Sequence, residues 1–87
     1  MAQANYKFKM GSATCELITG AAVANSEKEI THTLGVAPDM VIITPQKSAT
    51  VYESAAATSS VVKLTGSAAD STSNLLLIVD TAKIKTA

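Results

Sequence analysis

The chain has 87 residues and a mass of 8.9 kDa, with seven lysines, seven acidic residues and no arginine, so its formal net charge is zero. A nucleic-acid-binding domain would carry a basic patch, and a disordered chain would have fewer apolar residues than the 47% found here. The length indicates one β domain, residues 1–87, near the smallest size that one core stabilises alone.

Segments that direct a protein to a membrane are missing from the sequence pattern. The first residues lack the cationic and apolar stretches of a secretory signal, and the longest apolar run, Leu75–Val79, is too short to span a bilayer. We therefore expect synthesis in a cytoplasm and no contact with membranes. Residues 1–5 are mostly small and polar, so we expect them to form a flexible N-terminal arm.

The first predicted strand begins after this arm. Tyr6, Phe8 and Met10 alternate with Lys7 and Lys9, which is the period of two that a strand has when one face is buried and one is wet. We expect the two aromatic residues and the methionine to face the core.

A second strand is predicted over residues 13–19, with less regular alternation. Cys15 and Leu17 lie on one side, and Thr14, Glu16 and Ile18 on the other. Cys15 is the only cysteine, so no internal disulfide forms, and we expect it to be a small buried apolar residue.

The next strand shows clear alternation again. Ile30, His32 and Leu34 share one side of it, which favours a core or interface histidine over a general base. Gly35 follows, and we expect it to take a positive φ in the turn that leads to Pro38.

Two segments are apolar on both faces, Met40–Ile43 and Leu75–Val79. Such runs are typical of central strands, or of strands whose second face is covered by a partner. We hypothesise that these segments bury one face between subunits.

Short strands are also expected at residues 50–53, 60–65 and 82–86, and one helical turn at 54–58. With the strands above, these predict an all-β fold. It is a single antiparallel β-sandwich or small barrel of about seven or eight short strands.

Groups that carry catalysis or bind ligands are few in this sequence. With one histidine and one cysteine, no nucleophile–base pair can be identified, and we expect no enzyme activity, no cofactor and no metal. Residues 70–74 weakly resemble a calcium loop, but the alternating acids and central glycine of an EF-hand are missing, so a solvated loop is the preferred interpretation.

Residues 30–45, ITHTLGVAPDMVIITP, resemble a pattern of small β-rich virion proteins of tailed bacteriophages. In that pattern, an alternating strand that ends in His-x-Leu-Gly is followed, after a proline, by an apolar strand that ends in Thr-Pro. The resemblance extends over about residues 18–80. It is closest to capsid decoration (cement) proteins, although the aromatic residue often found in their last strand is missing from Leu75–Val79.

The resemblance implies a virion structural protein on the outer surface of a phage capsid. Such a protein would bind the major capsid protein as a homo-oligomer, with a trimer favoured, and would stabilise the shell. We expect the arm to dock on the capsid through Ala2, Gln3, Ala4, Asn5 and Tyr6. The alternative is a receptor- or glycan-binding β module of a phage tail or fibre.

Overall fold

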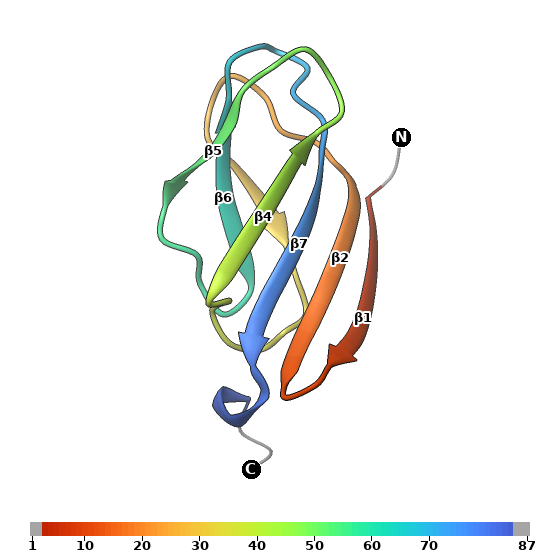
Figure 1. Cartoon of the computed structure of the whole chain (residues 1–87). Coiled ribbons are helices and arrows are strands. Elements are labelled where there is room, and N and C mark those ends of the chain that lie inside the picture. Colours follow the sequence, from red (N-terminus) through yellow and green to blue (C-terminus); the bar gives the residue numbers. More distant parts are fainter. Residues whose placement is uncertain (1–2, 85–87) are drawn as a thin grey trace.

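Two antiparallel sheets form the molecule in the computed structural model, which describes residues 3–84 (Figure 1). Sheet A has the order β1-β2-β7-β4, and sheet B the order β3-β6-β5. The strands are β1 (Ala4–Met10), β2 (Ala13–Ala21), β3 (Lys28–Thr31), β4 (Met40–Pro45), β5 (Val51–Ala55), β6 (Val61–Gly66) and β7 (Ser73–Asp80). The all-β prediction is confirmed, and the two separate sheets make the fold a sandwich.

The hydrophobic core lies between the two sheets. It is built from buried aliphatic residues of both: Ile18, Leu75, Leu77 and Val79 from sheet A, and Ile30, Val62 and Leu64 from sheet B. Burying each such side chain stabilises the fold by about 1.5–3 kcal/mol relative to exposure.

The two doubly apolar segments occupy different places in sheet A. Leu75–Val79 belongs to β7, which lies between β2 and β4, so its predicted central position is confirmed. Met40–Ile43 belongs to β4, which pairs only with β7 and forms an edge, so a central position for it was a wrong expectation. The second face of both segments points away from sheet B.

The turn before β4 confirms the glycine prediction, because Gly35 has a φ of 82°. Two other local predictions were wrong. Residues 54–58 contain no helical turn, since Ala55 extends β5 by pairing with Lys63.

The prediction of a last strand at residues 82–86 was also wrong where the structure describes it. Thr81–Lys83 form a 3-10 helix, η1, which Asp80 caps by accepting a hydrogen bond from the Ala82 amide at 3.0 Å. The cap satisfies one of the amides at the start of the helix that have no partner within the helix. Residues 85 and 86 of that predicted strand lie outside the described residues.

Candidate functional site

The outer face of sheet A, which points away from sheet B, is apolar across all four strands. The strand registers align its side chains in two rows, each running from β1 through β2 and β7 to β4. The rows are Tyr6–Leu17–Leu76–Ile42 and Phe8–Cys15–Ile78–Met40, and Met10 extends the face beyond the second row. We call these nine residues the outer apolar face.

Five of these side chains are exposed to a degree that is unusual for large apolar groups. The exposed fractions are 56% for Tyr6, 43% for Phe8, 54% for Met10, 54% for Met40 and 44% for Ile42. They contribute about 100 Å² each, or about 500 Å² together, which is near the upper end for the largest apolar patch on a monomer. Apolar patches of this size are often functional.

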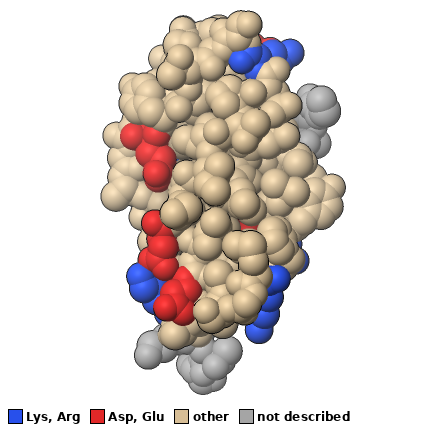
Figure 2. Space-filling model, viewed as in Figure 1, with Lys and Arg blue, Asp and Glu red and all other residues tan. Residues whose placement is uncertain are grey.

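Figure 2 views the molecule from this side. Its middle is almost entirely free of charged groups. Acidic groups gather on the side of β4 and β5, with a basic group among them at the lower end, and further basic groups lie at the lower end of the side of β1 and at the upper right of the view.

The side of β1 that points away from sheet B is the one that its alternation predicted to face the core. Tyr6, Phe8 and Met10 face solvent, so the prediction that they line the core was wrong. The opposite set, Asn5, Lys7 and Lys9, lies on the side of sheet B but is exposed as well, so burial does not alternate along this edge strand. Asn5 and Lys7 reach the carbonyls of Thr31 and Thr33, at 3.1 Å in each case.

Glu16 explains how polar side chains are accepted on the inner side. Its carboxylate is fully buried and accepts hydrogen bonds from the Thr33 amide at 2.9 and 3.1 Å and from the Thr33 hydroxyl at 2.9 Å. Asn5 donates to the same carboxylate at 2.6 Å, and Gln3 donates to the Thr31 carbonyl at 2.9 Å. We call Gln3, Asn5, Lys7, Glu16, Thr31 and Thr33 the polar clasp.

The polar clasp ties sheet A to the end of β3 and to the chain that follows it. Every buried side-chain polar atom in the described residues has a partner, so the clasp leaves no unpaired group in the interior. Its formation turns the apolar side of β1 outward, where the monomer has nothing to cover it. Both sides of β1 are solvent-accessible, since Asn5, Lys7 and Lys9 are exposed as well as Tyr6, Phe8 and Met10.

The segment predicted to bind a partner, Ala2 to Tyr6, lies at the start of this strand. Gln3 precedes β1, while Ala4, Asn5 and Tyr6 pair with Thr19, Ile18 and Leu17 of β2. Ala2 lies outside the described residues. Of this segment, Tyr6 belongs to the outer apolar face, whereas Gln3 and Asn5 belong to the polar clasp.

Cys15 is fully buried, as the sequence predicts, but it lies on the outer side of sheet A. It occupies the second row, where Phe8 on β1 and Ile78 on β7 are its cross-strand neighbours. Its side chain is covered by its neighbours and adds no exposed surface to the face.

His32 is buried, as its alternation with Ile30 and Leu34 predicts. The Leu34 amide donates to Nδ1 at 3.2 Å, so that nitrogen is the acceptor and Nε2 carries the proton, which it donates to the Thr58 carbonyl at 2.9 Å. Nε2 thus joins the chain after β3 to the segment before β6, whereas the bond at Nδ1 is local to the chain after β3.

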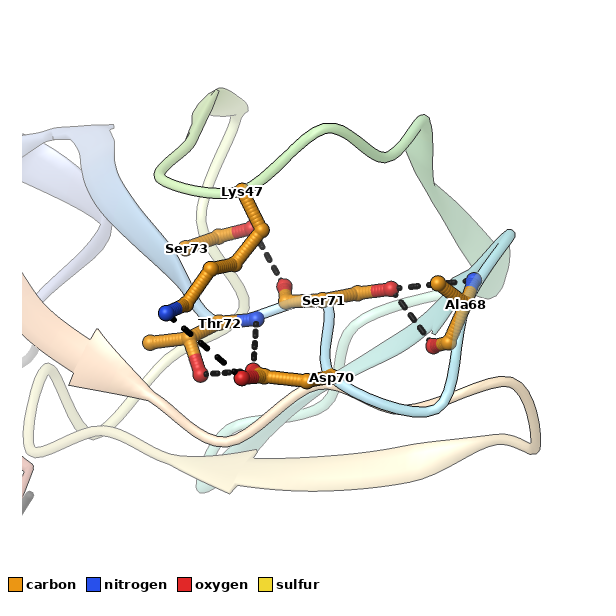
Figure 3. Close-up of polar contacts among 6 residues, drawn as sticks. All are labelled: Lys47, Ala68, Asp70, Ser71, Thr72 and Ser73. Carbon is orange, nitrogen blue, oxygen red and sulfur yellow. Dashed lines mark hydrogen bonds and ion pairs between the residues drawn. The ribbon is translucent and has the colours of Figure 1, made fainter.

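The polar side chains of residues 70–73 form hydrogen bonds mainly with neighbouring residues of the same loop (Figure 3). Oδ1 of Asp70 accepts from the amide and the hydroxyl of Thr72, and its Oδ2 lies 3.6 Å from Lys47 Nζ. Ser71 donates to the Ala68 carbonyl at 2.7 Å, and Ser73 donates to the Ser71 carbonyl. The solvated-loop interpretation is correct only for the start of the segment, since Asp70 is exposed but Ser71 and Ser73 are fully buried and β7 begins at Ser73.

An acidic and basic cluster lies where β4 begins and β7 ends. Lys83 Nζ donates to Oδ1 of Asp39, and the Asp80 amide donates to Oδ2 of Asp39 at 3.0 Å. The Lys83 hydrogen bond and then the Asp80 amide lower the pKa of the Asp39 carboxyl, and the carboxylate in turn raises the pKa of Lys83.

Metal-binding clusters and membrane-spanning helices are both missing from residues 3–84. No group of three or more histidine, cysteine, aspartate or glutamate side chains there is close enough to hold a metal ion. In the same part of the chain, no helix has the length and apolar character needed to cross a membrane.

The sequence indicated part of the outer apolar face. The doubly apolar segments identified β4 and β7 as strands with an uncovered side, whereas the contributions of β1 and β2 were assigned to the core. The irregular alternation of residues 13–19, with Ile18 on the same side as Glu16, was the one signal that the side facing inward was the mixed one. Comparison with known proteins gave no match, since no family model, no curated protein and no solved structure is significantly similar to this chain.

Proposed function

We propose that this chain is a structural assembly protein that works by adhesion to other protein surfaces and catalyses no reaction. The observation that carries the proposal is the outer apolar face, in which one flat surface presents large apolar groups from four strands without a central charge. A charge-depleted patch rich in aromatic residues and methionine has the composition of the core of a protein interface.

The setting we propose is the virion of a tailed phage, where the chain binds the outer surface of the capsid as an oligomer and stabilises the shell. This setting rests on the resemblance of residues 30–45. The apolar face supports the adhesive part of the proposal, since a decoration protein must bury surface against its neighbours.

A test of the proposal uses virions of a phage that encodes this chain. The chain should co-purify with them in many copies per capsid, and Y6E should co-purify in far fewer. Y52E is the matched control, because Tyr52 is similarly exposed, at 55%, but lies on sheet B. Virions that lack the chain altogether, or that retain Y6E and Y52E equally, would contradict the proposal.

A second candidate function has one observation in its favour. Tyr6 and Phe8 are both exposed and lie two residues apart on the same side of β1, an arrangement that suits stacking against a sugar ring. A glycan-binding module of a phage tail would therefore also use this face. Glycan-array binding by the wild-type chain that is lost in Y6E would favour this candidate.

A further inference from the structure

We infer that a second copy of this chain covers the outer apolar face, in a dimer whose two-fold axis runs parallel to the strands of sheet A. The inference rests on the proposed function, because it names the protein surface to which the face adheres. Three observations carry it: the area of the face, the order of its side chains, and the charges at its two edges.

The area is close to what a stable dimer needs. The five exposed side chains supply about 500 Å², and the half-buried Leu17, Leu76 and Ile78 lie between them in the same rows. A standard interface buries about 800 Å² on each partner, and the smallest specific ones about 600 Å². The whole sheet is therefore required, which favours a flat partner of the same dimensions, such as the same sheet in another copy.

The order of the side chains makes the face complementary to itself. An axis parallel to the strands, midway between β2 and β7, places β1 of one copy over β4 of the other and β2 over β7. Tyr6 then lies over Ile42 of the second copy, and Phe8 over Met40. Each aromatic ring packs on an aliphatic or thioether side chain, and the contact is repeated by symmetry.

The charges at the edges select this axis over the perpendicular one. Lys9 lies on β1 at one edge of the sheet, beside Lys7, which donates a hydrogen bond to the Thr33 carbonyl. Asp39 and Asp80 lie where β4 begins and β7 ends, and together with Lys83, which pairs with Asp39, they carry one net negative charge. Lys9 on β1 pairs with Thr14 on β2, which pairs with Val79 on β7. Asp39 lies at the far end of this cross-strand row, since its amide donates to the carbonyl of Ile78, the residue before Val79.

Rotation about an axis parallel to the strands therefore brings the lysine edge of one copy to the acidic edge of the other. An axis perpendicular to the strands would place β1 over β1, with lysines facing lysines and aromatic residues facing aromatic residues. Opposite charges at the rim favour the first arrangement and fix its direction. Because such a contact joins identical surfaces, it closes at two copies, and a trimer would need a different contact.

The test uses complementary charges in the first row. Wild-type chain at tens of micromolar should sediment as a dimer in analytical ultracentrifugation. Y6E and I42K should each weaken the dimer by at least about a hundredfold, because an unpaired charge would be buried in an apolar interface. An equimolar mixture of Y6E and I42K should dimerise again, since the new carboxylate of one lies over the new ammonium of the other.

Y52E should remain as dimeric as the wild type, because Tyr52 lies on sheet B. Circular dichroism and the unfolding transition show that each variant is folded, which is expected because positions 6 and 42 are exposed. A monomeric wild type at these concentrations overturns the inference. A dimer that survives both Y6E and I42K, or a mixture that fails to dimerise, overturns the contact or its axis.

The outcome is independent of the test of the proposed function. A monomer that still attaches to virions through Tyr6 overturns the dimer and leaves the adhesive function in place, with a shell protein on the face. A dimer that never attaches to virions overturns the virion setting and leaves the inference in place.

Discussion

At the scale of single residues, Glu16 has the largest consequence for the fold. Its buried carboxylate receives three hydrogen bonds from Thr33 and one from Asn5, so it joins the second strand of sheet A to both the first strand and the chain after β3. Hydrogen bonds to a charged group contribute about 1.5–3 kcal/mol each when a partner is lost in the interior.

We expect E16Q to lower the free energy of unfolding by about 2–3 kcal/mol, because an amide places its own N–H groups against the donors of Thr33 and Asn5. The measurement is urea denaturation followed by circular dichroism. E29Q is the control, because Glu29 is exposed on β3, and it should change the midpoint little. Equal midpoints for E16Q and E29Q would show that the polar clasp does not stabilise the sandwich.

Gly66 is required by close approach of the chain. A Cβ at this position would lie 2.2 Å from Ser71 Oγ and 2.3 Å from Ser71 Cβ, and Ser71 is fully buried with its hydroxyl bonded to Ala68. We expect G66A to lower the free energy of unfolding by about 1–3 kcal/mol through overpacking. In the double variant G66A/S71G, thermal unfolding should reveal a loss smaller than the sum of the two single losses. A strictly additive double variant would indicate that the two positions are not in steric conflict.

Some residue-scale properties could be predicted from the sequence and others could not. The burial of His32 and of Cys15 followed from their alternation and composition, which are local. Glu16 could not be recognised, because the donors that make its burial acceptable come from Asn5 and from Thr33, seventeen residues away in sequence. The sequence of a single strand does not determine which distant residues will be its hydrogen-bond partners.

At the scale of elements, η1 is anchored to the start of β4 by the Asp39–Lys83 pair. The pKa of Asp39 in the folded protein is lowered from its usual value of 3.8. The pair therefore stabilises the fold above that value, and its contribution disappears as the pH falls through the lower folded-state pKa.

We expect D39N to be slightly less stable than the wild type near neutral pH, and the difference to vanish under strongly acidic conditions where the wild-type carboxyl is also neutral. Urea midpoints measured over a pH series test this expectation. K83Q should give the same small loss, and D39N/K83Q no larger one, since both changes remove one interaction. A difference between wild type and D39N that persists at low pH would assign the effect to something other than the charge.

The strands themselves were the most predictable elements, because period two and apolar runs depend only on the sequence of each strand. The side of each strand that faces inward was less predictable. Tyr6, Phe8 and Met10 satisfy the pattern of a core face, yet β1 is an edge strand whose inner side meets the carbonyls of Thr31 and Thr33. The choice of face depends on register and on the position of the second sheet, and neither can be derived from one strand.

At the scale of the whole molecule, folding and association are linked if the outer apolar face is shared between copies. The melting temperature of the wild type should then rise with protein concentration, since each tenfold increase adds about 1.4 kcal/mol per mole of dimer to the free energy of unfolding. Y6E should melt at one temperature throughout a hundredfold range, as measured by scanning calorimetry. Concentration-independent melting of the wild type would contradict association through this face.

The polar clasp also sets how ready each half of the face is for binding. β1, which carries Tyr6 and Phe8, is tied by side-chain hydrogen bonds to the end of β3 and to the chain after it, whereas among the described residues no side-chain hydrogen bond joins β4 to β5. The aromatic half is thus preorganised and loses little freedom when it is covered. In the half on β4, the flexible side chain of Met40 can change its conformation to fit the surface that covers it.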